Sequence, residues 1–164
     1  MKKVLYLLIT VMVCMFFASA CFAASADEMR KDLEERAMQG EAEAQYKLGM
    51  MYAEGRGVKQ NSVKAAELHE KAAVQGHTNA QYNIGVLYRN GQGVKQDYAK
   101  SLEWFKKAAA QGNTPAQYNL GNMYENGLGV KKDFTTAKEW YGLACNNKHQ
   151  GGCTNYKRLN MKGQ

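Results

Sequence analysis

Residues Ala80 to Asp97 read AQYNIGVLYRNGQGVKQD, and the same pattern occurs three times in the chain. One copy, AQYKLGMMYAEGRGVKQN, begins at Ala44, and another, AQYNLGNMYENGLGVKKD, begins at Ala116. The three starting alanines are 36 residues apart, and the tyrosines and glycines inside the copies keep that spacing. A fixed period of this length is typical of a solenoid, in which each unit is one supersecondary element stacked on the next.

The start of each copy predicts an amphipathic helix with one buried face. In the first copy the apolar residues on that face are Ala44, Leu48, Met51 and Tyr52. Each copy also has a glycine inside this helix, which costs about 1 kcal/mol relative to alanine. We therefore expect the backbone of a neighbouring helix to approach closely there. The glycines are Gly49, Gly85 and Gly121.

A G-x-G-V run at residues 55–58, 91–94 and 127–130 predicts the end of the first helix, because glycine adopts positive φ without strain. Side chains suited to N-caps follow and predict a second helix. These caps are Asn61, Asp97 and Asp133. The residues expected on the inward face of the second helix are Ala65, Leu68, Ala72, Ala73, Trp104, Ala108, Ala109, Ala137, Trp140, Ala144 and Cys145.

The chain is therefore predicted to be an all-α solenoid of antiparallel helix pairs. The predicted units are residues 41–76, 77–112 and 113–148. Residues 27–40 end like a second helix and are expected to form an N-terminal capping helix, while residues 149–164 are expected to form a C-terminal half-repeat. Such caps are needed because terminal units otherwise expose an apolar face.

The repeated residues resemble the Sel-1-like repeat family, a branch of the tetratricopeptide-like helical solenoids. The pattern is A-x-x-x-L-G-x-x-Y-x-x-G-x-G-V-x-x-D followed by K-A-x-x-W-x-x-K-A-A-x-x-G, and it covers residues 41–148. The resemblance implies a right-handed α/α superhelix that acts as a non-catalytic scaffold. The expected partner is a protein or peptide, and the candidates are another envelope protein, a host protein or a peptidoglycan-associated component, among which the sequence does not choose.

The resemblance also implies where a partner binds, since the first helices of such solenoids line the concave surface. An asparagine directly after the repeated tyrosine is expected to bond an extended peptide, because an amide offers both donor and acceptor. The alternative is that these are solvated helix residues. The expected groove residues are Lys47, Met50, Asn83, Val86, Arg89, Asn90, Asn119, Asn122 and Glu125. Among them the predicted partner-binding residues are Lys47, Asn83, Arg89, Asn119 and Asn122.

Two cysteines mark the end of the last unit. Cys145 aligns with Ala73, and Cys153 aligns with Gln81, so the cysteines face each other across a helix-turn-helix. Cysteine-rich secreted members of the Sel-1-like family carry the same C-x7-C arrangement as a disulfide, so the resemblance implies a Cys145–Cys153 bond. The competing interpretation, a metal site that includes His149, lacks an adjacent fourth ligand.

The N-terminal residues predict export. Lys2 and Lys3 precede an apolar run at residues 4–17, and small residues follow, so residues 1–26 are predicted to be a secretory signal peptide. An uncleaved membrane anchor is the alternative. A third possibility is a lipoprotein in which Cys21 carries the lipid, although Ala18 stands where leucine is expected. The protein is thus expected to be periplasmic or secreted, with membrane attachment only through such a lipid.

The composition does not favour a nucleic-acid-binding protein. Removal of Lys2 and Lys3 with the signal leaves 20 basic and 15 acidic residues, and the basic ones are spread through every unit. Lysines recur at one loop position and form a stripe, which is interpreted as a solvated edge. They are Lys59, Lys95, Lys131 and Lys132.

No known catalytic motif stands out in the sequence, and the chain is predicted to be neither an enzyme nor a cofactor-binding protein. Residues 135–138 place a hydroxyl three positions before a lysine, but these are ordinary positions of the second helix. Some cysteine-rich relatives have been associated with β-lactam binding or hydrolysis. The resemblance therefore keeps that activity as the alternative function.

Overall fold

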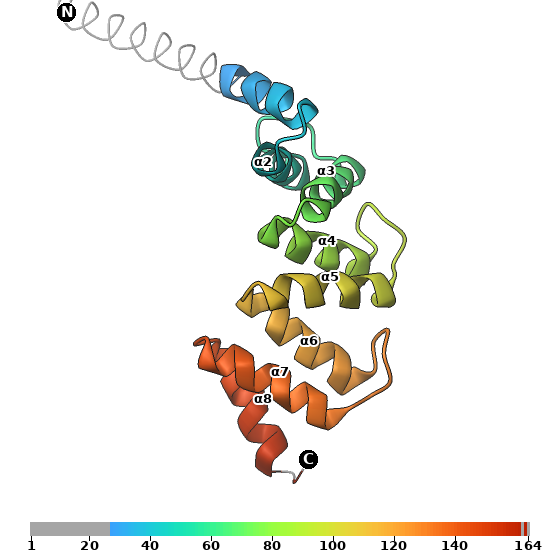
Figure 1. The fold of residues 1–164 in the computed structure, drawn as a ribbon. Helices are drawn as coiled ribbons and strands as arrows, with labels where there is room; N and C mark the ends of the chain where they lie inside the picture. Colours follow the sequence, from blue (N-terminus) through green and yellow to red (C-terminus); the bar gives the residue numbers. More distant parts are fainter. Residues whose placement is uncertain (1–26, 162, 164) are drawn as a thin grey trace, which may run out of the picture.

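The computed structural model describes residues 27–161 and 163, and the regular structure in this part of the chain is helical (Figure 1). Residues 27–38 are helical, and seven further helices follow: α2 (Ala42–Glu54), α3 (Ser62–Val74), α4 (Thr78–Asn90), α5 (Tyr98–Ala110), α6 (Thr114–Asn126), α7 (Phe134–Asn146) and α8 (Gln150–Met161). Each helix packs mainly against its neighbours in sequence. The result is an elongated stack of antiparallel pairs, as the 36-residue period predicts.

The helix ends follow the repeated sequence signals. We call α2, α4, α6 and α8 the A helices, and α3, α5 and α7 the B helices. The first three A helices end at a left-handed glycine with φ between 70° and 72°, at Gly55, Gly91 and Gly127. Each B helix begins after a side chain that accepts a hydrogen bond from the backbone N–H three residues later. These N-caps are the predicted Asn61, Asp97 and Asp133.

The hydrophobic core runs along the stack between A and B helices. Alanines at equivalent positions of both helix types are fully buried, which lets the helices approach closely. Among the predicted inward residues, Leu68, Trp140 and Cys145 are only partly buried. The large side chains that fill the space between the helices are Ile84, Phe105, Leu120, Met123, Tyr141 and Leu159.

The glycines inside the A helices make room for rings, not for backbone as the sequence suggested. A Cβ atom on Gly85 would lie 2.8 Å from a ring carbon of Phe105, and one on Gly121 would lie 2.5 Å from a ring carbon of Tyr141. Gly49 has the same relation to the imidazole of His69, at 2.9 Å. Each ring comes from the B helix of the same unit, 20 residues further along the chain.

The close backbone approach occurs instead at the second glycine of the loop. Gly93 has φ +72°, and a Cβ atom there would lie 2.0 Å from the carbonyl oxygen of Ser62 in the preceding unit. Gly129 is placed in the same way, with Tyr98 as its neighbour at 2.5 Å. In the second and third units the G-x-G run therefore ends the A helix with its first glycine and packs against the previous unit with its second, whereas Gly57 in the first unit meets, among the described residues, only Met51 of the same unit.

Residues 27–38 cover the first end of the stack. Ala37 is buried, and Leu33 packs beside it against Ala44 and Leu48 of α2. Arg36 pairs with Glu41 across the turn that leads into α2, with 2.6 Å between the charged atoms. Within the described residues, no helix is both long enough and apolar enough to span a membrane. The predicted signal peptide, including Cys21, lies outside the described part of the chain.

Candidate partner-binding surface

The A helices contact one another through side chains at the positions predicted to face a partner. Asn83 Nδ2 of α4 lies 3.2 Å from the sulfur of Met50 on α2. Arg89 of α4 donates from Nη1 to Oδ1 of Asn119 on α6. These contacts join α2, α4 and α6 into one surface, and a further pair joins α6 to α8. We call this the A-helix surface, defined by Lys47, Met50, Asn83, Val86, Arg89, Asn119, Asn122, Glu125, Asn155 and Arg158.

Two of the predicted binding residues differ although they share a repeat position. Asn83 is half-buried, and no donor among the described residues meets its Oδ1. Asn119 is only 7% exposed; its Nδ2 donates to the carbonyl oxygen of Pro115 at 2.9 Å, and its Oδ1 accepts from Arg89. Asn83 can therefore still accept a hydrogen bond, whereas the amide of Asn119 is used inside the protein.

Arg89 is held at the centre of the surface. Its Nη1 donates to Asn119, and its Nε donates to Oδ1 of Asn90 at 3.2 Å. No carboxylate in the described part of the chain pairs with this guanidinium. Lys47, the other predicted cation, is exposed and pairs with Glu43 on its own helix at 3.0 Å. Arg89 is thus the oriented positive charge of the surface that lacks an acidic partner among the described residues.

A polar network closes the surface near α8. The hydroxyl of Tyr141 lies 2.6 Å from Oδ1 of Asn122 and 2.9 Å from Oε2 of Glu125. Arg158 Nη2 donates to both carboxylate oxygens of Glu125 at 2.7 Å. Burial raises the pKa of Tyr141 far above its ordinary value, and the bond to Glu125 adds to the effect. The phenol therefore stays protonated and keeps Asn122 and Glu125 in place.

Two members of the A-helix surface were missed in the sequence. Asn155 continues the series of Asn83 and Asn119, and Arg158 continues the series of Met50, Val86 and Asn122. The sequence does indicate both residues, because the 36-residue spacing continues from α6 to α8 without an insertion or deletion. These residues extend the surface onto the last described helix.

Two histidines each cap an A helix and stack on a tyrosine of the preceding A helix. His77 Nδ1 accepts from the backbone N–H of Ala80 at 3.2 Å and caps α4, and its ring stacks on Tyr46 with 4.5 Å between the centroids. His149 stacks on Tyr118 at the same distance and caps α8. With Nδ1 as acceptor, the proton lies on Nε2 of His77, which donates to Glu43 at 3.0 Å.

His69 is the buried histidine. It is 2% exposed, and its Nδ1 has no hydrogen-bond partner among the described residues. Its repeat position holds Phe105 and Tyr141 in the following units, which are ordinary core residues. Burial lowers the pKa of His69 to about 4, so the ring is neutral at pH 7.

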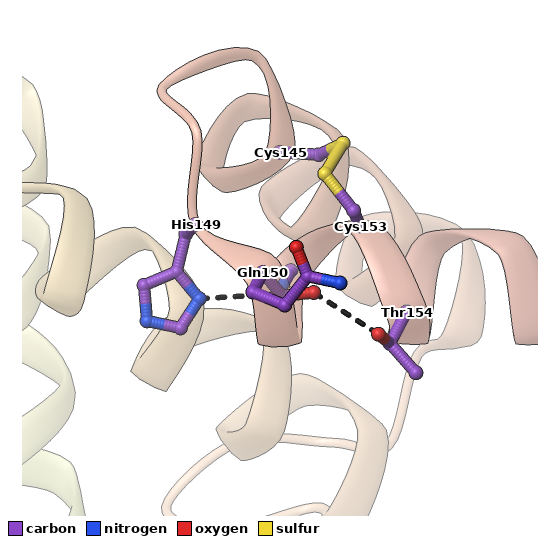
Figure 2. Close-up of a disulfide and its surroundings, with 6 residues drawn as sticks. Cys145, His149, Gln150, Cys153 and Thr154 are labelled. Atoms are coloured by element: carbon purple, nitrogen blue, oxygen red, sulfur yellow. Dashed lines mark hydrogen bonds between the residues drawn. A yellow bond between two sulfur atoms is a disulfide. The ribbon is translucent and has the colours of Figure 1, made fainter.

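Cys145 and Cys153 form the disulfide that the resemblance implies (Figure 2). The bond joins the last turn of α7 to the first turn of α8, with 4.4 Å between the Cα atoms. His149 lies in the turn between the two cysteines, but its ring points away from the sulfurs, and its Nδ1 accepts from the N–H of Gly152 at 3.1 Å (Figure 2). The two sulfurs are bonded to each other, and the histidine serves as a helix cap. Such disulfides persist in oxidising compartments.

The comparison with protein-family models decides the family. The Sel1 repeat model matches residues 42–77, 78–113 and 114–149, which is three consecutive units of this chain. The chain belongs to the Sel1 repeat family. The matched units begin one residue later than the predicted ones, so that each starts within an A helix instead of before it.

Solved structures of bacterial Sel1-like repeat proteins resemble this Sel1 repeat protein. A protective antigen present in uropathogenic Escherichia coli strains, which displays an SLR fold, is 41% identical with a TM-score of 0.72, over 75% of this chain and 26% of that one. A Sel1 repeat protein from Oxalobacter formigenes is 33% identical with a TM-score of 0.73, over 75% and 51%. This chain therefore spans about a quarter of the length of the Escherichia coli protein and about half of the length of the Oxalobacter formigenes protein.

A third solved structure is that of a protein described as cysteine rich. Helicobacter pylori cysteine rich protein B is 25% identical to this Sel1 repeat protein, with a TM-score of 0.59, over 76% of this chain and 95% of that one. No curated protein matches the chain significantly.

Proposed function

We propose that this Sel1 repeat protein is a non-catalytic scaffold of the bacterial cell envelope that binds a peptide or protein partner along the A-helix surface. The observation that carries the proposal is the pair formed by Asn83 and Arg89 on α4. Among the described residues, the amide oxygen of Asn83 meets no donor, and the oriented guanidinium of Arg89 meets no carboxylate. Both lie on a surface that continues from α2 to α8.

The chemistry of this pair suits an extended peptide. The Asn83 oxygen can accept from a peptide N–H, and its N–H groups can donate to a peptide carbonyl. Arg89 can bind a carboxylate or a peptide carbonyl with good geometry, because Asn119 and Asn90 already restrict its orientation. A restricted side chain loses less conformational entropy when a partner binds. Asn122 and Glu125 would line the path of the same peptide further along α6.

The location in the envelope rests on separate observations. The apolar run after Lys2 and Lys3 favours export, and the Cys145–Cys153 bond fits an oxidising compartment. One relative is described as a protective antigen of uropathogenic strains. We therefore propose that this chain is also located outside the cytoplasm and that its partner there is an envelope or host protein. Mass spectrometry of the protein from an envelope fraction tests export, and an intact Met1 would contradict it.

The experiment on function uses the exported protein as bait in an envelope extract. The captured partner is identified, purified and titrated against the wild type and the Asn83→Ala/Arg89→Ala variant, which should bind it at least about tenfold more weakly. The Lys71→Ala/Lys107→Ala variant changes exposed residues of two B helices and should bind like the wild type. Equal affinity of the first variant would contradict the proposed surface. Turnover of a β-lactam by the pure protein would contradict its non-catalytic character.

A further inference from the structure

The loop between the A and B helices forms a surface pocket at the same place in two units. In the first unit the pocket has a volume of about 500 Å³, and in the second it has about 520 Å³. The shared lining of the first pocket is Tyr52, Val58, Lys59, Gln60, Asn61 and Lys64. The lining of the second is Tyr88, Val94, Lys95, Gln96, Asp97 and Lys100, each 36 residues later. We call these two cavities the loop pockets.

Each loop pocket presents two exposed lysines without a carboxylate partner among the described residues. The carboxylates that line the pockets have other roles. Glu34, which also borders the first pocket, pairs with Arg30 at 2.7 Å. Asp97 in the second pocket accepts from the backbone N–H of Lys100 at 2.9 Å as the N-cap of α5. Both pockets are therefore positively charged.

An aromatic ring and an oriented amide complete each pocket. The ammonium of Lys64 lies 5.0 Å from the ring centre of Tyr52, and that of Lys100 lies 5.1 Å from the ring centre of Tyr88. The amides belong to Gln60 and Gln96. Each donates through Nε2 to a backbone carbonyl of the preceding A helix at 2.8 Å, which fixes the side chain and leaves the oxygen to accept.

This combination suits an acidic sugar better than a simple anion. The lysines would bind a carboxylate or sulfate, and the glutamine oxygen would accept from a hydroxyl. In the first pocket the partly buried Tyr52 also offers an apolar edge to the sugar ring, whereas Tyr88 in the second pocket is only 7% exposed and forms its floor. The two pockets have volumes typical of small-molecule sites. Because they recur from one unit to the next, a polymer with regularly spaced acidic groups could occupy both.

The third unit also carries positively charged side chains on its loop, but it does not repeat the full set of pocket residues. Lys131 and Lys132 lie on the α6–α7 loop, which projects to the same side of the stack as the α4–α5 loop (Figure 1). Lys132 lies over the ring of Phe134, with 4.7 Å from the ammonium to the ring centre. Successive helix pairs are rotated relative to one another (Figure 1). A flexible chain can follow such a turning edge more readily than a flat membrane surface can.

We propose that the loop pockets bind a linear acidic polysaccharide, with acidic sugars in the pockets of the first and second units and additional contacts to Lys131 and Lys132. This site is separate from the A-helix surface and does not depend on the protein partner. Two linked sites should bind a polymer much more tightly than either binds a single sugar, because the second contact is intramolecular.

The test is calorimetric titration of the exported protein with polygalacturonate, galacturonate monomer and neutral dextran. Polygalacturonate should bind, with an affinity that falls as salt rises, while the monomer should bind at least about a hundredfold more weakly and dextran should not bind. The variant Lys59→Gln/Lys64→Gln/Lys95→Gln/Lys100→Gln should lose at least about tenfold in affinity for the polymer. Changing only one pocket should give an intermediate loss.

The matched control removes the same charge elsewhere. Lys31→Gln/Lys71→Gln/Lys107→Gln/Lys157→Gln changes four exposed lysines outside both loop pockets, and its affinity should stay within about threefold of the wild type. An equal loss in both variants would overturn the proposal, because net charge alone would then explain binding. Tighter binding to phosphatidylglycerol vesicles or to single-stranded DNA than to polygalacturonate would also overturn it.

Discussion

Gln81 donates a hydrogen bond from Nε2 to the carbonyl oxygen of Ala73, 3.1 Å away, and so ties the start of α4 to the end of α3. Gln45 makes the same bond to Ala37 at the start of α2. At the junction of α7 and α8 the equivalent positions hold Cys145 and Cys153, where a disulfide replaces the hydrogen bond. The chain thus links α7 and α8 covalently at the point where α2 and α4 are tied to the preceding helix by a buried amide.

This equivalence predicts how the C-terminal end responds to mutation. Cys145→Ala/Cys153→Ala should lower the free energy of unfolding by about 2–3 kcal/mol, as expected for a short disulfide loop. Cys145→Ala/Cys153→Gln restores the residue pair of the earlier units and should recover about 1 kcal/mol of that loss through the amide hydrogen bond. Urea unfolding under oxidising conditions measures both values. Equal stability of the two variants would contradict this prediction, because the glutamine at position 153 would then form no stabilising hydrogen bond.

His69 provides a second test, because its burial with no partner for Nδ1 in the described part of the chain is unfavourable. His69→Phe places at this position the residue type found at Phe105, and it should stabilise the protein by about 1 kcal/mol at pH 7. His77→Phe is the control and should destabilise it, since it removes the N-cap of α4. Thermal unfolding of both variants at pH 7 distinguishes them. A loss of stability in His69→Phe would mean that the imidazole makes a favourable contact.

The same residue predicts a pH dependence. The pKa of His69 is about 4 in the folded protein, against an ordinary value of 6.5. Between these values the unfolded chain binds a proton that the folded chain does not, so the free energy of unfolding should decrease as pH falls through this range. The advantage of His69→Phe over the wild type should therefore grow between pH 7 and pH 4.5, as measured by unfolding at several pH values. A constant difference would contradict the low pKa.

Much of the fold could be predicted from the sequence because its signals repeat. The period, the loop glycines and the N-caps Asn61, Asp97 and Asp133 each act locally, and the same local physics operates in every unit. The ring under each A-helix glycine was harder to identify. His69, Phe105 and Tyr141 occupy the same repeat position but differ in chemical class. They can be recognised as equivalent only by their spacing of 36 residues.

The binding surface was less predictable because its residues depend on contacts between units. Asn83 and Asn119 occupy one repeat position, yet Asn119 is buried because Arg89 reaches it from α4, whereas Asn83 meets Met50 from α2. These neighbours come from the variable part of each unit. Repeat position alone therefore indicates that a residue lies on the A-helix surface but does not indicate whether its polar groups are available.

The glycine inside α6 should tolerate no side chain. Gly121→Ala should destabilise the protein by more than about 1 kcal/mol, although alanine favours helix formation, because its Cβ would lie 2.5 Å from the buried ring of Tyr141. Gly142→Ala in α7 is the matched control. Its Cβ would meet the exposed Tyr156, which can move, so stability should be unchanged or improved. Urea unfolding of the pair gives the comparison, and equal stabilities would contradict the packing described here.

The two asparagines should differ in stability as they differ in environment. Asn119→Ala should cost about 1–2 kcal/mol, because it removes bonds to Pro115 and Arg89 at a buried site. Asn83→Ala should cost less than about 0.5 kcal/mol, because the one hydrogen bond of its side chain within the described residues is to a sulfur. Thermal unfolding of the single variants separates them. Similar costs for both would show that the inter-helix bond of Arg89 contributes little.

The claim that a partner binds along the A-helix surface is tested most directly by photocrosslinking in living cells. A photoreactive amino acid is placed at Val86, between Asn83 and Arg89 on α4, or at Val74, which is 73% exposed on the B helix α3. The account predicts a discrete protein adduct from position 86, absent from position 74 and lost when Asn83 and Arg89 are changed to alanine. An adduct that forms from position 74 but not from position 86 would contradict it.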